Sequence, residues 1–132
     1  MSEKNRKILL RYWIGWITFL IIFVLNRYYF NLYFLEKDFK PLTYLLYAFL
    51  AVSNFIECNR LFHYLEKEHY EKWKGITNVP GFGEGGANFL EGIPFLFSDE
   101  DFGDPKVLEL KKHYKLFLIY TIVVLISYHM WK

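Results

Sequence analysis

Cysteine, proline and glycine are all scarce in this sequence of 132 residues. The single cysteine, Cys58, has no partner for an internal disulfide, which excludes a scaffold held together by disulfide bonds. Four prolines and eight glycines are too few for a collagen-like or a Pro/Gly-rich disordered chain. The formal net charge of +2 is too small to favour nucleic-acid binding, and the length allows no more than one domain.

Apolar and aromatic residues are abundant instead, at 54% and 22% of the chain, although 23% of the residues are charged. The two kinds are segregated, because nearly all the charges lie outside three apolar runs. A helix needs about 20 apolar residues to cross a hydrocarbon core of about 30 Å. The sequence therefore predicts an all-α integral membrane protein, a single membrane domain over residues 1–132, with transmembrane helices at about 8–25, 42–58 and 116–131.

The first apolar run follows three basic residues, an arrangement that also occurs in cleaved signal peptides. A signal peptidase would need small residues after Leu25, but the chain continues with Asn26 and Arg27. We therefore expect an uncleaved membrane span, with Arg11 and Arg27 snorkelling towards water at its ends. Its predicted interfacial aromatic residues are Trp13, Trp16, Tyr28 and Tyr29.

The distribution of basic residues predicts the orientation in the membrane. Residues 1–11 and 57–115 hold twelve of the 16 lysines and arginines, and the other four lie elsewhere. Cytoplasmic segments of membrane proteins are enriched in basic residues. We therefore predict a cytoplasmic N-terminus, an outer hairpin over residues 26–40 and a cytoplasmic segment over residues 59–115.

The second and third membrane helices are both predicted to extend into the cytoplasm. Residues 57–74 contain no glycine or proline, and they place Leu61, Leu65, His69 and Trp73 along one helical face. Gly75 is predicted to end this helix. Residues 77–92 contain five of the eight glycines, which predicts an irregular Gly-rich segment between the two extensions.

Two further helix starts are predicted. Ser98, with Asp101 three residues later, resembles an N-cap with an acidic third residue, which favours a short surface helix. Asp104 followed by Pro105 combines a capping acceptor with a proline at the first helical position. This pair predicts one uninterrupted helix from Pro105 to Trp131.

The sequence contains only incomplete forms of motifs that bind a ligand or a metal. The glycine-rich stretch 81–86 lacks the Gly-Lys-Ser/Thr ending of a phosphate-binding loop. The acidic stretch 99–104 has Leu110 where a calcium loop requires Glu. We predict no cofactor and no bound metal. A site built from His69, His113 and an acidic residue across two helices stays open, with polar packing or interfacial histidines as the alternatives.

Two polar residues near the inner end of the second span are candidates for contacts between helices. Asn54 and Glu57 lie where a side chain can form hydrogen bonds to a neighbouring membrane helix. For Glu57 the alternative is solvation at the membrane interface.

The second half of the chain resembles a known group of small membrane proteins. The resemblance is carried by Leu65, His69-Tyr70, Trp73, Phe95-Leu96-Phe97-Ser98, Gly103-Asp104-Pro105-Lys106-Val107 and the basic-to-apolar C-terminal helix. These residues resemble the universal stress protein B family of bacterial inner-membrane proteins. The resemblance implies a cytoplasmic segment between two spans, a link to stress survival and no known catalytic activity. The additional N-terminal span and the Gly-rich insert depart from the family.

Three classes of function remain. The leading hypothesis is a non-enzymatic multi-pass membrane protein, with the stress-related role that the resemblance implies, that acts through helix packing and its cytoplasmic segment. Its expected partners are the lipid bilayer and a second copy or another protein, but not nucleic acid. The alternatives are a pore-forming or membrane-disrupting effector, although no span carries a polar stripe that would line a channel, and a membrane-surface enzyme. The candidate interaction or structural residues are Trp73, His69, Phe95, Phe97, Asp104, Pro105, Glu57 and Asn54.

Overall fold

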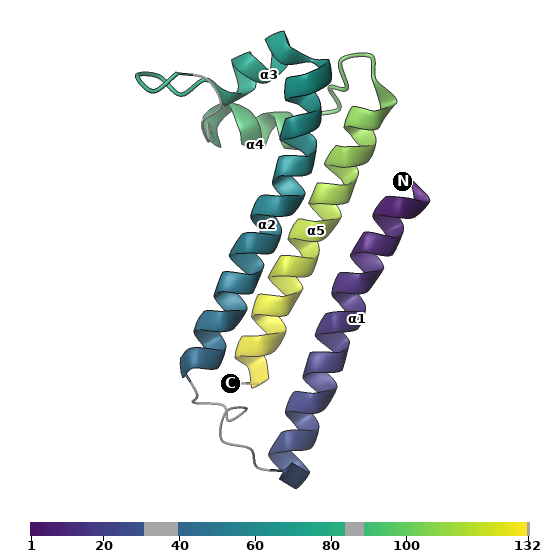
Figure 1. The fold of residues 1–132 in the computed structure, drawn as a ribbon, viewed down its shortest axis with the longest axis vertical. Coiled ribbons are helices and arrows are strands. Elements are labelled where there is room, and N and C mark those ends of the chain that lie inside the picture. Colours follow the sequence, from purple (N-terminus) through teal and green to yellow (C-terminus); the bar gives the residue numbers. More distant parts are fainter. Residues whose placement is uncertain (31–39, 84–88, 132) are drawn as a thin grey trace. The chain divides into compact units, whose positions relative to one another are not determined.

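The computed structural model describes residues 1–30, 40–83 and 89–131. In these residues the chain forms five α-helices and one π-helical turn. The helices are α1 (Glu3–Leu25), α2 (Lys40–Glu68), α3 (Tyr70–Thr77), α4 (Phe89–Phe97) and α5 (Pro105–Trp131), and the π-helical turn Asn26–Phe30 directly follows α1 (Figure 1). The only β-type pairing in the described part is an isolated bridge between Val79 and Gly83. The prediction of an all-α fold is confirmed.

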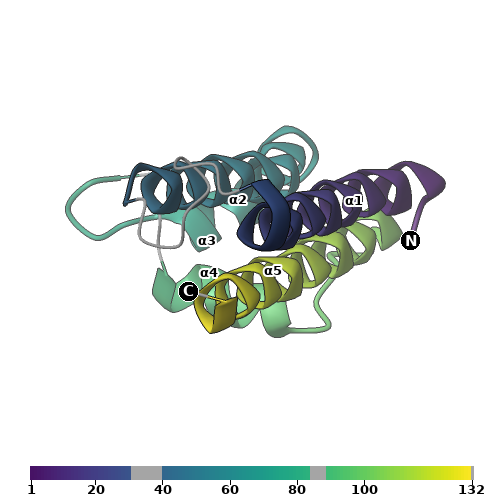
Figure 2. The ribbon, with the colours of Figure 1, turned by 90° about the horizontal axis from the view of Figure 1, so that it is seen from below.

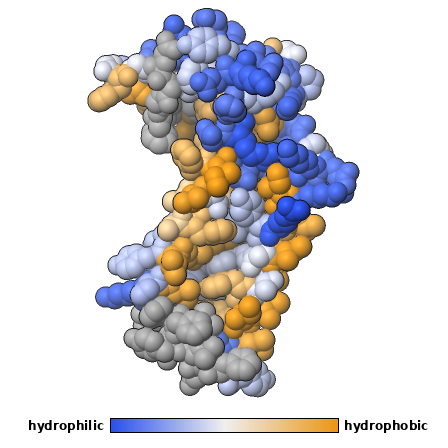
Figure 3. Space-filling model, in the orientation of Figure 1, coloured by the Kyte–Doolittle hydropathy of each residue, from blue (hydrophilic) through white to orange (hydrophobic). Residues whose placement is uncertain are grey.

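Three of these helices, α1, α2 and α5, are long and apolar enough to cross a membrane. Each of them contains one of the predicted spans. On α1, Ile14, Ile17 and Ile21 each expose more than half of their surface, as lipid-facing residues do. Apolar side chains cover much of these helices in the space-filling view (Figure 3). These features indicate a multi-pass membrane protein in contact with the lipid bilayer. The predicted outer hairpin lies mostly outside the described residues.

Local capping determines where α1 and α5 begin. Ser2 Oγ accepts a hydrogen bond from the N–H of Asn5 at 3.3 Å and begins α1. Asp104 Oδ1 accepts the N–H of Lys106 at 3.0 Å, and Pro105 occupies the first position of α5. The predicted uninterrupted helix from Pro105 to Trp131 is confirmed.

The chain divides into two compact units, which we name by their composition. The three-helix unit consists of Ser2–Phe55 and Leu116–Lys132 and contains α1, the first part of α2 and the last part of α5. The polar unit consists of Ile56–Lys115 and contains the end of α2, α3, α4 and the start of α5.

The core of the three-helix unit is built around α5. Phe117, Tyr120, Val124 and Tyr128 of α5 each expose 3% of their surface or less. Trp16 of α1 donates its Nε1–H to Ser127 Oγ at 3.1 Å, and Thr43 of α2 shares a 2.8 Å hydrogen bond with Tyr128. The three helices of this unit therefore lie side by side, as the end-on view also shows (Figure 2).

Trp16 does not occupy the interfacial position that the sequence predicts. It is buried, with 6% of its surface exposed, because it lies midway along α1 and faces α5. The indole N–H finds its polar partner on Ser127 rather than in a headgroup region.

In the polar unit, the predicted continuous helix over residues 57–74 is wrong. The helix α2 ends at Glu68, His69 takes the non-helical φ and ψ of −138° and 50°, and α3 runs past Gly75 to Thr77. Histidine is not an intrinsic helix breaker. Its ring contacts Asp104, far along the sequence, and this tertiary contact overrides the local helical pattern.

The Gly-rich segment between α3 and α4 is shorter than predicted. Residues 78–83 form a turn and residues 84–88 lie outside the described residues, but Phe89–Phe97 forms α4. The helix includes Gly92 and Pro94 because its burial of Phe95 and Leu96 outweighs their weak helix propensity.

The short helix predicted to start at Ser98 is also wrong. Ser98 follows the C-terminal end of α4, where its N–H donates to Pro94 O at 3.0 Å and its Oγ donates to Phe95 O at 2.7 Å. The hydroxyl therefore satisfies a carbonyl at the end of one helix instead of an N–H at the start of another.

Candidate functional site

The polar side chains of the polar unit form three hydrogen-bonded clusters. In the first, the Glu57 cluster, Glu57 on α2 and His113 on α5 are both buried, with 3% and 1% of their side chains exposed. His113 Nε2 lies 2.6 Å from Glu57 Oε2, and Arg60 Nη1 donates to the same oxygen at 3.0 Å. A buried carboxylate requires such partners because an unpaired charge away from water costs several kcal/mol. Glu57 therefore connects two helices and is not simply solvated.

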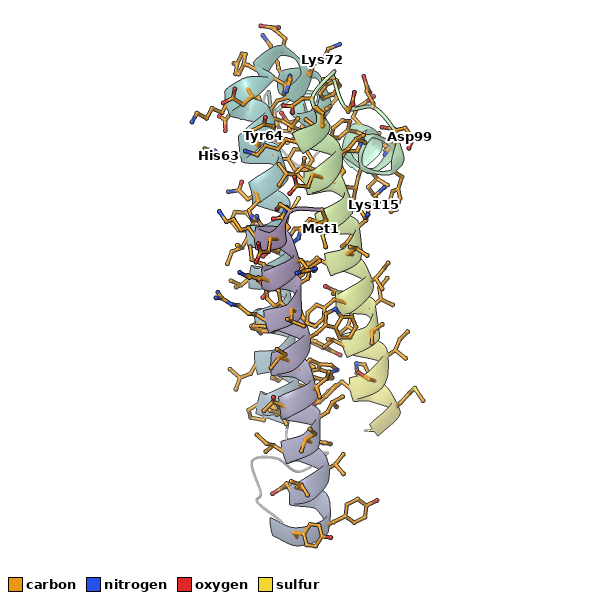
Figure 4. The ribbon with its side chains drawn as sticks, turned by 90° about the vertical axis from the view of Figure 1, so that its right-hand side faces the viewer. Met1, His63, Tyr64, Lys72, Asp99 and Lys115 are labelled. Atoms are coloured by element: carbon orange, nitrogen blue, oxygen red, sulfur yellow. The ribbon has the colours of Figure 1, made fainter. Side chains whose placement is uncertain are left out.

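The second cluster, the Asp104 cluster, is centred on one carboxylate. The hydroxyl of Tyr64 donates to Asp104 Oδ2 at 2.5 Å, and His69 Nε2 lies 3.0 Å from the same oxygen. These hydrogen bonds lower the pKa of Asp104 from its ordinary value of 3.8 to about 2, and the one from His69 has a larger effect than the one from Tyr64. Tyr64 is labelled on α2 in Figure 4, where the neighbouring His63 points away from α5. Asp104 thus links α2, the break before α3 and the start of α5.

The third cluster is centred on Lys111 of α5, which exposes only 1% of its surface. Its Nζ donates to Ser98 O at 2.9 Å, to Ser98 Oγ at 3.1 Å and to Glu100 O at 2.8 Å. It also lies 4.1 Å from the centroid of the Phe95 ring. A cation at the C-terminal end of a helix is favourable because the helix dipole is negative there. Lys111 therefore holds the end of α4 against α5.

The turn before α5 is held by aromatic stacking and an unusual backbone conformation. Phe102 and Gly103 have φ of 56° and 74°, in the left-handed region that favours glycine. The ring of Phe102 stacks on Phe95 with centroids 5.3 Å apart and an interplanar angle of 5°. Asp101 Oδ1 accepts the N–H of Gly103 at 2.9 Å. The stack and the turn together hold Phe102 in a conformation that costs about 1–2 kcal/mol for a non-glycine residue.

An apolar face of α4 and a neighbouring groove are open to the surroundings. Leu90, Ile93 and Phe97 expose 85%, 51% and 63% of their surfaces, and their spacing of three and four places them on one side of α4. A groove of about 450 Å³ lies between α3 and α4, with Lys72 and Glu91 among its lining residues. These three side chains form an exposed apolar face of α4.

The structure brings some of the predicted site residues together. His69 meets Asp104, and Glu57 meets His113. The two histidines belong to different clusters, so the site that combined both of them with an acidic residue is not assembled. In the ranges described, no three His, Cys, Asp or Glu side chains are placed to hold a metal ion.

The other predicted residues lie apart from one another. Phe95 is buried while Phe97 is exposed, and Trp73 is half-buried with its ring 5.5 Å from that of Tyr70. Pro105 begins α5. Asn54 lies in the three-helix unit, where its Nδ2 donates to Leu50 O at 2.8 Å and to Thr121 Oγ1 at 3.1 Å.

Sequence reasoning missed Tyr64, Lys111 and Phe102. Each of them contacts a partner that is distant along the chain or has a backbone conformation that no local sequence pattern predicts. Lys111 resembles an ordinary surface lysine in the basic stretch before the third span. Its burial becomes visible only in the structure, where the segment that follows α4 packs over Lys111.

No protein-family model matches the chain, and neither a curated protein nor a solved structure matches it. The fold defines the class as a helical protein that has three helices able to cross a membrane in the part of the chain that the structure describes. The resemblance to the universal stress protein B family stays a prediction from short residue patterns.

Proposed function

We propose that the chain is a non-catalytic, multi-pass membrane protein that binds another protein through the apolar face of α4. The observation that carries this proposal is the exposure of Leu90, Ile93 and Phe97 on one side of that helix. Contiguous apolar surface outside the spans costs free energy in water, and such patches mark interaction sites. An i, i+3, i+7 spacing is also the one that helices use to anchor in a partner's groove.

The contacts that hold α4 in place support this proposal. Phe95 and Leu96 of the same helix are buried, and Lys111 donates hydrogen bonds to the carbonyl oxygens of Ser98 and Glu100, which follow its C-terminal end. A binding face on a fixed element loses little conformational entropy when the partner docks. The Glu57 and Asp104 clusters are engaged in connecting helices, which fits a supporting role better than a catalytic one.

The proposed location is the bacterial inner membrane, with the N-terminus and residues 59–115 in the cytoplasm. The bias of lysines and arginines towards these segments supports the orientation. The resemblance to the universal stress protein B family supports the location and suggests stress survival as the setting. Single cysteines in a Cys58→Ser background test the orientation. A membrane-impermeant thiol reagent added outside should label Tyr29→Cys and not Lys106→Cys, and the opposite pattern would overturn the topology.

Photo-crosslinking tests the proposed binding face directly. A photoreactive phenylalanine analogue at Ile93 should yield a discrete protein adduct in membranes, whose mass distinguishes a second copy from another protein. The same analogue at Lys112, exposed on α5 of the same unit, is the matched control and should yield none. Phe97→Ser should remove the adduct formed at Ile93, whereas Tyr70→Ser on α3 should not. Adducts to lipid alone, or equal adducts at both sites, would contradict the proposal.

One observation favours a second candidate, an enzyme acting at the membrane surface. The carboxylate of Asp104 orients the imidazole of His69, an arrangement that general bases use. Purified protein that hydrolyses lipid headgroups, and loses this activity in His69→Gln but not in His63→Gln, would establish it.

A further inference from the structure

The three-helix unit contains a groove of about 660 Å³ between α1 and α2, and Tyr120 of α5 contributes to its lining. On α1 the lining residues recur at steps of three and four from Ile8 to Phe19, so they form one helical face. On α2 the lining is aliphatic and aromatic, from Leu42 to Phe49. A groove of this size and composition suits a hydrocarbon chain.

The groove contains one charged residue, Arg11. Its side chain is exposed, and no ion pair or hydrogen bond holds its guanidinium within the part of the chain described. The carboxylate of Glu3, in the first turn of α1, is already 2.7 Å from Nζ of Lys7. A cation inside a membrane span is costly unless it meets an anion or water. The guanidinium therefore provides an unmatched positive charge at one end of an apolar groove.

The length of the groove matches one leaflet of a bilayer. The eight steps along the helix from Arg11 to Phe19 rise about 12 Å at about 1.5 Å per residue. Half of a hydrocarbon core of about 30 Å is about 15 Å. Gly15 keeps the middle of the groove open, because a Cβ built there meets no atom within 4 Å.

We propose that this groove binds one anionic phospholipid of the leaflet that surrounds the N-terminal end of α1. The phosphate accepts hydrogen bonds from the guanidinium of Arg11, whose planar donors suit phosphate oxygens. An acyl chain lies along the groove past Gly15 towards Phe19. Lys4 continues the side of α1 that carries Arg11, and its positive charge favours a lipid with net negative charge over a zwitterionic one.

Native mass spectrometry of the full chain, released from detergent with added lipid, tests the site. Phosphatidylglycerol should bind with one-to-one stoichiometry and more tightly than phosphatidylcholine with the same acyl chains. Arg11→Gln should weaken phosphatidylglycerol binding about five-fold, as expected for one charge near an anionic lipid, and should bring it close to phosphatidylcholine. Arg6→Gln, which removes an equal charge from another side of α1, is the matched control and should change binding little.

A second variant tests the groove itself. Gly15→Leu should fill the open space without a backbone clash and with a gain in helix propensity, so the protein should fold and yet lose the one-to-one lipid complex. Circular dichroism and thermal unfolding confirm that the variant is folded. Equal weakening by Arg11→Gln and Arg6→Gln would show only general attraction to anionic lipid and would overturn the proposal. So would unchanged binding in Gly15→Leu, or saturation by a fatty acid that phosphatidylglycerol cannot displace.

Discussion

The carboxylate of Asp104 has two roles, capping α5 and accepting hydrogen bonds from Tyr64 and His69, and two substitutions separate them. In Asp104→Asn the side-chain oxygen still accepts the N–H of Lys106 and begins α5, because asparagine caps helices as well as aspartate does. The negative charge that accepts hydrogen bonds from Tyr64 and His69 is lost. In Asp104→Ala both roles are lost.

The magnitudes follow from the pKa of Asp104 and from the hydrogen bonds. A pKa lowered from 3.8 to about 2 corresponds to about 1–2 kcal/mol of native-state stabilisation, at about 1.4 kcal/mol per pH unit and reduced for partial solvent contact. Asp104→Asn should therefore lower the free energy of unfolding by about 1–2 kcal/mol. Asp104→Ala should cost about 1 kcal/mol more, the typical value of an N-cap. Tyr64→Phe, which removes one donor, should cost about 1 kcal/mol.

The stabilisation that Asp104 provides should decrease as the pH falls. Because the folded-state pKa of Asp104 lies below its ordinary value, its stabilisation is fully present above about pH 4 and is lost as the pH falls towards about 2. The stability difference between the natural chain and Asp104→Asn should therefore shrink over this interval.

Denaturant titration in detergent micelles, followed by circular dichroism, measures these free energies. Amide hydrogen exchange around His69 and in the first turns of α5 locates the effect. If Asp104→Asn unfolds like the natural chain at every pH while Asp104→Ala does not, Asp104 acts only as a helix cap. The reasoning about its contacts with Tyr64 and His69 would then be refuted.

Three further predictions test other contacts. Gly103→Ala should lower the free energy of unfolding by about 1 kcal/mol, because Gly103 has a positive φ. Gly75→Ala should raise it, because Gly75 lies on a helix and has open space for a methyl group. Denaturant titration measures both changes. Lys111→Met should destabilise by about 2 kcal/mol and accelerate hydrogen exchange at Ser98, since three hydrogen bonds from the ammonium group are lost. Trp16→Phe should cost about 0.6 kcal/mol in thermal unfolding beyond the loss of packing, the typical value of a hydrogen bond between membrane helices.

Much of the fold could be predicted because its signals are local. Hydrophobic run length determines which helices can cross a membrane, and the Asp104-Pro105 pair marks the start of α5. The polar unit was predicted less well. Ser98 carries a helix-start signal, but the apolar run before it forms α4, so the same hydroxyl caps a C-terminal end.

The candidate site was harder to predict than the fold. Asp104, His69 and Glu57 were chosen from the sequence, but the pairing of Glu57 with His113 was not predicted, because these two residues are 56 residues apart. The exposed face of α4 was not predicted either. Of its residues, Leu90 lies in the predicted Gly-rich segment, and only the burial of Phe95 and Leu96 defines which side of the helix is open.

The sequence by itself determined the segregation of apolar runs from charges, and with it the three helices that can cross a membrane. It did so because helix length and hydrophobicity are properties of contiguous residues. Only the tertiary structure decided that the helix breaks at His69, that Lys111 is buried and that Arg11 faces an apolar groove. These features depend on which segments approach one another, and that approach depends on packing between residues that no local pattern connects.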